Sequence, residues 1–339
     1  MQWAQGARRF SATCRNWCGG LFNRILNRLR AADSDAWRLW GKRAGLTLVG
    51  FLLLYYPLGM MWRHTINDDL EFTVAAISPG QSQAVAVTAA LIDREVNQAG
   101  WVANNPFFMP SAPLDNMPNY QMGLIEALAR FSVELKDQIG RTRGSSQADT
   151  DLQEAAGLLQ YSGTRWVWDF SVSLWPTASS EAQYRKAREA LLAYNARLAQ
   201  GDAVFERRND NLMATLDRIA LDIGSSSAVL DQHLSARAVR LIDREVDDVF
   251  YGVKGKMYGY TLILKALRND FAEVIKERAL EGAYEQMLVS FAQAAALDPW
   301  VIINGAPDSQ ILPSHLASQG FYLLRARTQL REVTNILLK

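Results

Sequence analysis

Cysteine is scarce in this chain of 339 residues. The two cysteines, Cys14 and Cys18, lie close together near the N-terminus, and no cysteine follows them. The long remainder therefore has no disulfide, and its stability must come from packing. The spacing of the two thiols is not that of a C-x-x-C redox pair, and two further metal ligands are missing. We interpret them as reduced thiols on a helix surface, with acylation as the alternative.

Histidine is almost as scarce, which excludes most metal and triad chemistry. His64 adjoins a long apolar run, and neither His233 nor His315 has a metal-ligating side chain three or four residues further on. A zinc site or a His-based triad would need distant residues that the sequence does not identify. No phosphate-binding glycine loop is present either. We predict no metal site and no cofactor.

Charge is absent from Ala44–Trp62, a run long enough to cross a membrane. Residues 1–43 carry nine basic residues against two acidic ones, although the whole chain has a formal charge of only +1. This basic excess predicts that residues 1–43 stay in the cytoplasm and that the chain after Trp62 is exported. A cleaved signal peptide is disfavoured, because its basic region would be unusually long and no small-residue cleavage site follows closely.

The basic N-terminal segment has its own helical pattern. Trp17, Leu21, Phe22, Ile25, Leu26 and Leu29 recur at helical spacing, with arginines between them. This indicates an amphipathic helix on an anionic membrane surface, and a helix that docks on a cytoplasmic partner is the alternative. Because the exported part is acidic overall, we do not expect it to bind nucleic acid.

A six-residue motif occurs twice. Leu91–Val96 returns unchanged as Leu241–Val246, and shorter matches follow in the same order, such as Trp166-Val167 with Trp300-Val301. Collinear matches of this kind predict an internal duplication. The predicted parts are a cytoplasmic segment (1–43), a membrane span (44–62), a linker (63–83), a first repeat (84–200), a connecting helix (201–233) and a second repeat (234–339).

The copies differ most between Val96 and Glu126, where the first is longer. Its segment Gly100–Tyr120 is rich in proline, asparagine and aromatic residues, which predicts an ordered, non-helical loop. The second copy has Tyr251–Tyr260 at this place. Gly140–Asp149 and Gly224–Ser227 have the composition of polar connections.

Elsewhere the periodicity is helical. The predicted helices cover 84–99, 121–139, 149–160, 180–200, 202–222, 228–250, 260–280, 282–296 and 315–337. Only Thr164–Leu174 and Trp300–Asn304 have the composition of strands, and extended loops are the alternative there. The predicted fold is mainly α: a single N-terminal transmembrane helix and an internally duplicated helical periplasmic domain with at most a few short strands.

Two glutamates stand at the same place in the repeated motif. On a regular helix, Glu95 and Glu245 would lie on or beside the buried stripe, while the neighbouring Asp and Arg would point elsewhere. Facing each other across a cavity, they could perform acid/base glycoside hydrolysis. We favour a structural interpretation, in which each Glu accepts a buried hydrogen bond or ion pair from an Arg, because duplicated active sites usually lose one copy.

The predicted loop is the better candidate for binding. It combines apolar anchors with polar groups, as a peptide or glycan groove would. The alternative is that it folds back and plugs the helical core. The candidate binding residues are Trp101, Asn104, Asn105, Phe107, Phe108, Met109, Asp115, Asn116 and Tyr120.

Three stretches together resemble a known family. Leu91–Tyr120, Gly140–Asp149 and Gly224–Leu230 are similar to a proteobacterial inner-membrane family known as domain-of-unknown-function family 2333. The resemblance implies a Gram-negative host and a periplasmic domain. It implies no activity and no catalytic residues.

These observations predict a single-pass protein of the bacterial inner membrane with a cytoplasmic N-terminus. Its periplasmic domain is expected to be a scaffold or binding module of the cell envelope without catalysis. The alternative is an envelope-modifying enzyme of the glycan hydrolase type that uses Glu95 and Glu245 or Asp115. The expected partners are the lipid bilayer and an envelope protein or glycan, and association into homo-oligomers is left open.

Overall fold

The computed structural model describes residues 34–75, 77–141, 147–169, 172–236, 244–305 and 312–339. Cys14, Cys18 and the predicted amphipathic helix lie outside these residues. The chain divides into two compact units, Met1–Leu58 and Gly59–Lys339. Each unit is described by itself.

The described part of the first unit is helical. Helix α2 extends over Ser34–Arg63, so its last turn belongs to the second unit. From Trp37 onward it is long and apolar enough to cross a membrane, and only 6% of its most apolar 18-residue window is buried. The helix thus contains the predicted span, and protein covers almost none of its apolar surface.

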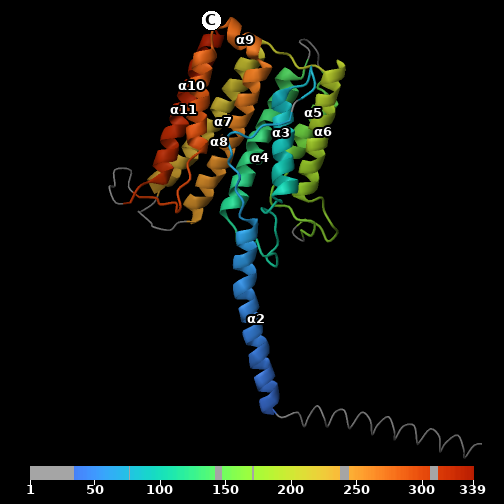
Figure 1. Ribbon diagram of the computed structural model, residues 1–339, viewed down its shortest axis with the longest axis vertical. Helices are drawn as coiled ribbons and strands as arrows, with labels where there is room; N and C mark the ends of the chain where they lie inside the picture. Colours follow the sequence, from blue (N-terminus) through green and yellow to red (C-terminus); the bar gives the residue numbers. More distant parts are fainter. Residues whose placement is uncertain (1–33, 76, 142–146, 170–171, 237–243, 306–311) are drawn as a thin grey trace, which may run out of the picture. The chain divides into compact units, whose positions relative to one another are not determined.

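The second unit is built from helices that run alternately in opposite directions (Figure 1). They are α3 (Gln83–Asp93), α4 (Asn116–Glu134), α5 (Thr150–Leu159), α6 (Ser180–Gln200), α7 (Asn209–Ala236), α8 (Arg244–Asp270), the short α9 (Ala272–Glu277), α10 (Glu281–Ala295) and α11 (His315–Leu337). Two π-helical turns, η1 (Arg94–Gln98) and η2 (Leu135–Ile139), extend α3 and α4. The predicted mainly α fold is confirmed.

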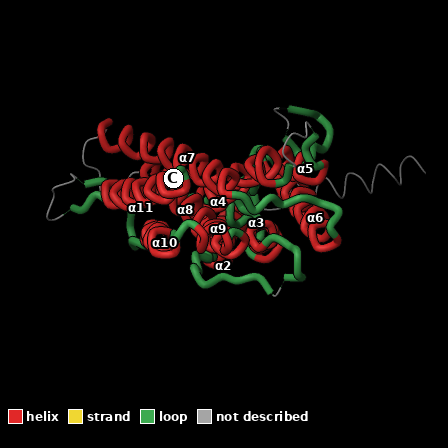
Figure 2. Tube along the Cα trace, turned by 90° about the horizontal axis from the view of Figure 1, so that it is seen from above, coloured by secondary structure: helices red, strands yellow, loops and turns green. Residues whose placement is uncertain are grey.

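Helices α4 and α8 form the centre of the second unit. Seen along the helices, α3, α5 and α6 lie on one side of this pair, and α10 and α11 lie on the other (Figure 2). Gly123 and Gly255 let the two backbones approach closely: a Cβ on Gly123 would overlap the Gly252 carbonyl, and one on Gly255 would overlap the Tyr120 carbonyl. The contact of α4 with α8 therefore requires residues without a side chain at both positions.

This packing corrects the prediction of separate helices at 228–250 and 260–280. Tyr251–Tyr260 is the middle of the continuous helix α8. Glycine weakens an isolated helix, but here Gly255 and Gly259 face α4, and the gain in packing outweighs their low propensity.

Helix α7 corrects a second predicted break. Gly224–Ser227 lies inside α7 and not in a polar connection. The hydroxyls of Ser225 and Ser226 donate to the carbonyl of Asp222 at 2.6 and 3.3 Å, so both are satisfied within the helix. The predicted helix at 202–222 begins only at Asn209.

No strand occurs in the described part of the chain. The described residues of Thr164–Leu174 form an irregular loop, and within Trp300–Asn304 only Asn304 makes an isolated bridge, to Ser314. Isolated backbone hydrogen bonds and side-chain hydrogen bonds hold both segments in place of a ladder. Of the two alternatives for these segments, strands or extended loops, the described residues form loops.

A buried carboxylate fixes where α3 begins. Asp270, at the end of α8, accepts hydrogen bonds from the Ser82 hydroxyl (2.7 Å) and from the backbone nitrogens of Gln83 (2.8 Å) and Ala84 (2.9 Å). Burial raises the pKa of Asp270, and the two backbone donors oppose that shift. The carboxylate thus joins the C-terminal end of α8 to the N-terminal end of α3.

Candidate functional site

Glu95 lies in a sealed polar network between α3, α4 and α8. Its side chain is 2% exposed. Arg94 contacts Glu95 Oε1 through Nε (2.9 Å) and Nη2 (2.8 Å), and Gln121 Nε2 donates to Glu95 Oε2 (3.1 Å). Both carboxylate oxygens are thus held by neighbouring side chains, and Glu95 has no open access to a substrate.

Arg94 is the residue of this network that sequence reasoning placed wrongly. It was expected to point away from the core, yet it is 5% exposed. The π-helical turn at Arg94–Gln98 is wider than an α-helical turn, so the backbone rotates less from one residue to the next. Arg94 and Glu95 therefore lie on the same buried face. Its Nη1 donates to the Tyr258 hydroxyl (2.6 Å), and its guanidinium lies 5.2 Å from the Phe72 ring and 5.0 Å from the Tyr258 ring.

The charges of this network stabilise each other. Burial disfavours the Arg94 cation, but Glu95 and the nearby tyrosines outweigh this and raise the pKa of Arg94. Burial also raises the pKa values of Tyr120 and Tyr258. The hydroxyls of these tyrosines donate to the backbone oxygens of Asn67 (2.9 Å) and Asp69 (2.8 Å), so the network also holds the linker that follows α2.

Glu245 lies in a different environment. It is exposed in the first turn of α8, whereas Glu95 is buried in η1, the turn that follows α3. The first three residues of the second motif, 241–243, fall outside the described residues. The structure therefore does not bring Glu95 and Glu245 into one enclosed cavity, and the internal duplication stays a prediction.

The candidate binding loop divides into a buried base and an exposed tip. Non-helical residues extend only to Asp115, because Asn116–Tyr120 forms the start of α4. Trp101, Asn104 and Tyr120 are buried, at 4%, 5% and 0% exposure. Trp101 Nε1 donates to the Gly163 carbonyl (2.7 Å), and Asn104 Nδ2 donates to the Arg165 carbonyl (2.8 Å). These three residues hold the loop and the body together.

The tip of the loop presents Phe107 and Phe108, which are 83% and 49% exposed. Asn105 and Met109 beside them are half-buried, and Asn105 Nδ2 donates to the Ser111 hydroxyl (2.6 Å). The Phe108 ring lies edge-on to the Trp166 ring, 5.5 Å away. Two aromatic side chains thus stand in solvent on a loop whose base is fixed.

The acidic end of the loop caps α4 and connects it to α8. Asp115 caps α4 and accepts from the Asn116 nitrogen (3.0 Å). The Asn116 side-chain amide, with its nitrogen toward them, donates to Asp115 Oδ1 (3.0 Å) and Asp247 Oδ2 (2.7 Å). Burial, and then the charges of Asp115 and Asp248, raises the pKa of Asp247 to about 6. In the described chain, no group of three or more His, Cys, Asp or Glu side chains could hold a metal ion.

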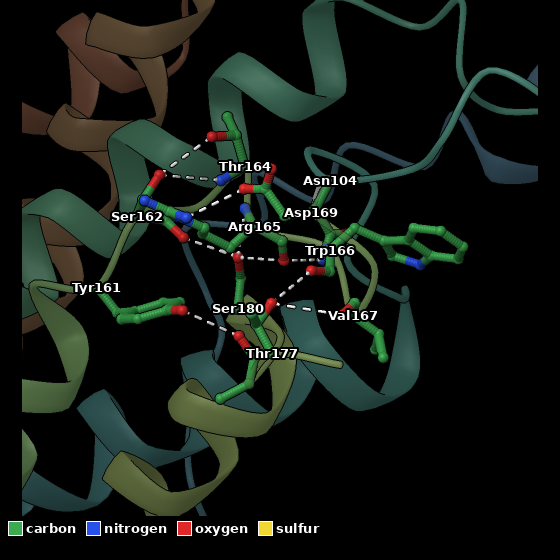
Figure 3. A network of polar contacts seen from close by, with 11 residues as sticks. Asn104, Tyr161, Ser162, Thr164, Arg165, Trp166, Val167, Asp169, Thr177 and Ser180 are labelled. Atoms are coloured by element: carbon green, nitrogen blue, oxygen red, sulfur yellow. Dashed lines mark hydrogen bonds and ion pairs between the residues drawn. The ribbon is translucent and has the colours of Figure 1, made fainter. Parts of the chain in front are cut away.

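The loop between α5 and α6 is ordered by hydrogen bonds around Ser180 (Figure 3). The Ser180 hydroxyl bonds to the Ser162 carbonyl (2.7 Å) and accepts from the Arg165 nitrogen (3.0 Å). Thr177 bonds through its backbone nitrogen to the Val167 carbonyl (2.8 Å), which closes the loop. This order leaves large apolar side chains outside: Trp168, Leu174 and Trp175 are 45%, 81% and 78% exposed.

A third loop, between α10 and α11, carries Trp300, which is fully exposed. The loop is attached to α8 through Lys254, whose side chain is only 1% exposed. Lys254 Nζ lies 3.2 Å from Asp298 and 2.8 Å from Asp68 of the linker. Sequence reasoning did not select Trp300, Leu174 or Trp175 as site residues, although large apolar residues outside the periodic helices were a visible signal.

Away from these loops, the linker borders a groove of about 500 Å³ between α3, α8 and α10. Leu262, Leu288 and Val289 line it with apolar groups. Lys265 pairs with Glu71 (3.2 Å) at its edge, and Arg268 pairs with Glu285 (2.7 Å). None of the predicted site residues lines this groove.

The family of the chain follows from its sequence. Neither the curated proteins nor the solved structures contain a match to it. The profile of the DUF2333 family, described as an uncharacterized protein conserved in bacteria, matches residues 38–243 and 241–339. Because these matches cover most of the chain, the protein belongs to the DUF2333 family of bacterial proteins.

Proposed function

We propose that this protein is a scaffold or binding module of the bacterial cell envelope, anchored in the inner membrane by α2. The observation that carries the proposal is the uncovered apolar surface of α2, with only 6% of its most apolar window buried. An apolar helix of this length that protein does not cover is stable in a lipid bilayer. The basic residues ahead of α2 support a cytoplasmic N-terminus and a periplasmic second unit.

The environment of Glu95 favours a role without catalysis. A glycosidase needs two carboxyl groups that reach the scissile bond from opposite sides. Glu95 is held by Arg94 and Gln121, and Asp115 caps a helix. These contacts support the structural interpretation of Glu95 and give Asp115 a structural role as well.

The groove bounded by the linker, α3, α8 and α10 is the surface that we propose for an envelope protein or glycan. It combines apolar side chains with paired charges at its edge, which suits a ligand that has both apolar and polar groups.

Thiol labelling tests the anchor and its orientation in whole cells. Both native cysteines, Cys14 and Cys18, precede α2. We expect a membrane-impermeant maleimide to label the wild type only after lysis. Val204 is 39% exposed in the loop between α6 and α7, so Val204→Cys in a chain with both native cysteines changed to Ser should be labelled before lysis. Labelling of both chains only after lysis would refute the periplasmic location.

Photo-crosslinking in cells tests the groove. Val289 lines the groove and is 45% exposed, and Leu192 on α6 is 41% exposed but does not line it. A photoreactive residue at Val289 should give a specific product with an envelope protein or glycan, which Lys265→Glu weakens. The same residue at Leu192 should give no such product. Equal products at the two positions would exclude the groove as the binding surface.

A further inference from the structure

Large apolar side chains stand in solvent on three separate loops. They are Phe107 after α3, Leu174 and Trp175 after α5, and Trp300 after α10, at 83%, 81%, 78% and 101% exposure. We call the described residues of 99–115, 160–179 and 296–314 the proximal loops. Exposed apolar side chains that gather on one surface of a protein often mark a site that a partner or a membrane covers.

The alternation of helix directions puts the proximal loops at one end of the second unit. The loops after α3, α5 and α10 each follow a helix that runs toward the same end (Figure 1). Direct contacts join the first two: Asn104 donates to the Arg165 carbonyl, and the Phe108 ring packs on the Trp166 ring. The exposed aromatic residues therefore share one end of the bundle.

This end is also where the last turn of α2 is attached. Gly59 lies within the predicted span, and a Cβ built on it would overlap the Pro110 side chain, three residues after Phe107. Four residues further along, Arg63 Nη1 donates to the Ala99 carbonyl (3.1 Å). The tip and the base of loop 99–115 are both in contact with the final residues of α2.

We propose that the proximal loops form a lipid-binding surface, which inserts Phe107, Leu174, Trp175 and Trp300 into the outer leaflet of the membrane that α2 spans. This inference rests on the proposed anchoring by α2. Because Gly59 lies near the end of the predicted span, Pro110 and the loop tip beside it would reach the level of the bilayer interface. Tryptophan and phenylalanine are favourable there, because the ring is partly desolvated and the indole N–H still reaches polar groups.

The arrangement favours a lipid surface over one small ligand. The aromatic side chains belong to three loops that approach the end of the bundle from different helices, and they are exposed one by one or in pairs. Two acidic side chains at this end, Asp68 and Asp298, share the buried Lys254 as their cation. Burial of the rings in lipid therefore does not require those two carboxylates to be desolvated without a partner.

Depth-dependent quenching in the full chain tests the proposal. Single cysteines at Phe107, Leu174 and Trp300, in a chain with Cys14→Ser and Cys18→Ser, carry an NBD fluorophore in phosphatidylethanolamine–phosphatidylglycerol vesicles. Nitroxide lipids with the spin label near the headgroup should quench the fluorescence of these three labels at least threefold more than that of a control label at position 338. Leu338 is 68% exposed at the C-terminal end of α11. A label at Leu53 in α2 should be quenched best by a nitroxide deep in the acyl chains.

The Leu53 label separates the two ways in which the experiment can fail. If it is not quenched, the anchor itself is refuted. If it is quenched but the loop labels behave like Leu338, the anchor stands and the lipid-binding surface is refuted. Loop labels that are shielded from aqueous iodide without nitroxide quenching would show a protein partner or a second copy on this surface, which also overturns the proposal.

A variant that keeps its label but loses two of the apolar side chains checks that these side chains insert the loops into the lipid. Phe107→Ser with Trp300→Ser should reduce quenching of a label at position 175 at least threefold. Because both side chains are exposed, the variant should keep the melting temperature of its parent. Unchanged quenching in this folded variant would contradict the role of the aromatic residues.

Discussion

The guanidinium of Arg94 is held by an ion pair with Glu95, a hydrogen bond to Tyr258 and the ring faces of Phe72 and Tyr258. Arg94→Met should destabilise the protein by about 3–5 kcal/mol, because it leaves Glu95 charged and buried without its cation. Urea unfolding of the detergent-solubilised chain measures the change.

Arg188 provides the matched control for Arg94. It pairs with Asp93 at 3.2 Å with a side chain that is 32% exposed, so Arg188→Met should cost about 1 kcal/mol or less. Similar costs for the two variants would show that the Arg94 pair is not buried as described. Arg94→Met combined with Glu95→Gln should recover part of the loss, since the second change removes the stranded charge.

Asp247 should make stability depend on pH. Its folded pKa of about 6 lies above the ordinary value of 3.8, so the folded state holds the proton more tightly than the unfolded state. The resulting stabilisation is complete below about pH 4 and is lost as the pH rises through about 6. Asp247→Asn should therefore raise the melting temperature more at pH 7.5 than at pH 5.

Asp210 is the opposite case, because its hydrogen bond with Arg208 lowers its pKa. The stabilisation from this carboxylate is already complete above about pH 4. Asp210→Asn should therefore have the same effect on the melting temperature at pH 5 and pH 7.5. A pH dependence at Asp210 that equals the one at Asp247 would contradict both assignments.

The packing of α4 on α8 makes a prediction about whole helices. Gly255→Ala should separate the helices and cost about 1–3 kcal/mol, because the new methyl group overlaps the Tyr120 carbonyl. At Gly252, one helical turn earlier, a Cβ would meet only the Asn119 carbonyl at 3.8 Å, an ordinary contact. Gly252→Ala should be neutral or stabilise by up to about 1 kcal/mol through helix propensity. Chemical unfolding of both variants gives the comparison, and equal effects would refute the close contact.

Periodicity predicted most helices, because their apolar stripes are buried in one core. It failed where tertiary packing decides the outcome. The glycines of Tyr251–Tyr260 have a function only when α4 is present, and the serines near Gly224 satisfy their hydroxyls inside α7. Arg94 was placed wrongly because a π-helical turn cannot be read from spacing. Of the candidate binding loop, the sequence could not separate the buried Trp101 and Asn104 from the exposed Phe107.

For the molecule as a whole, the uneven charge around α2 should decide its orientation. Arg38, Lys42 and Arg43 lie shortly before the apolar run. Changing all three to Glu should reduce maleimide labelling of the Val204→Cys chain before lysis, because fewer chains keep a cytoplasmic N-terminus. Lys276→Glu with Arg278→Glu, more than 200 residues after the span in the sequence, should leave labelling unchanged. Equal labelling of all three chains would show that charge does not set the orientation.

The contacts of Gly59 and Arg63 with loop 99–115 limit how far the protein extends. The longest described helix of the bundle, α7, has 28 residues, which corresponds to a length of about 40 Å. These contacts join the last turn of α2 directly to one end of the bundle. The opposite end, where the C-terminus lies, is therefore held about one helix length, roughly 40 Å, from loop 99–115.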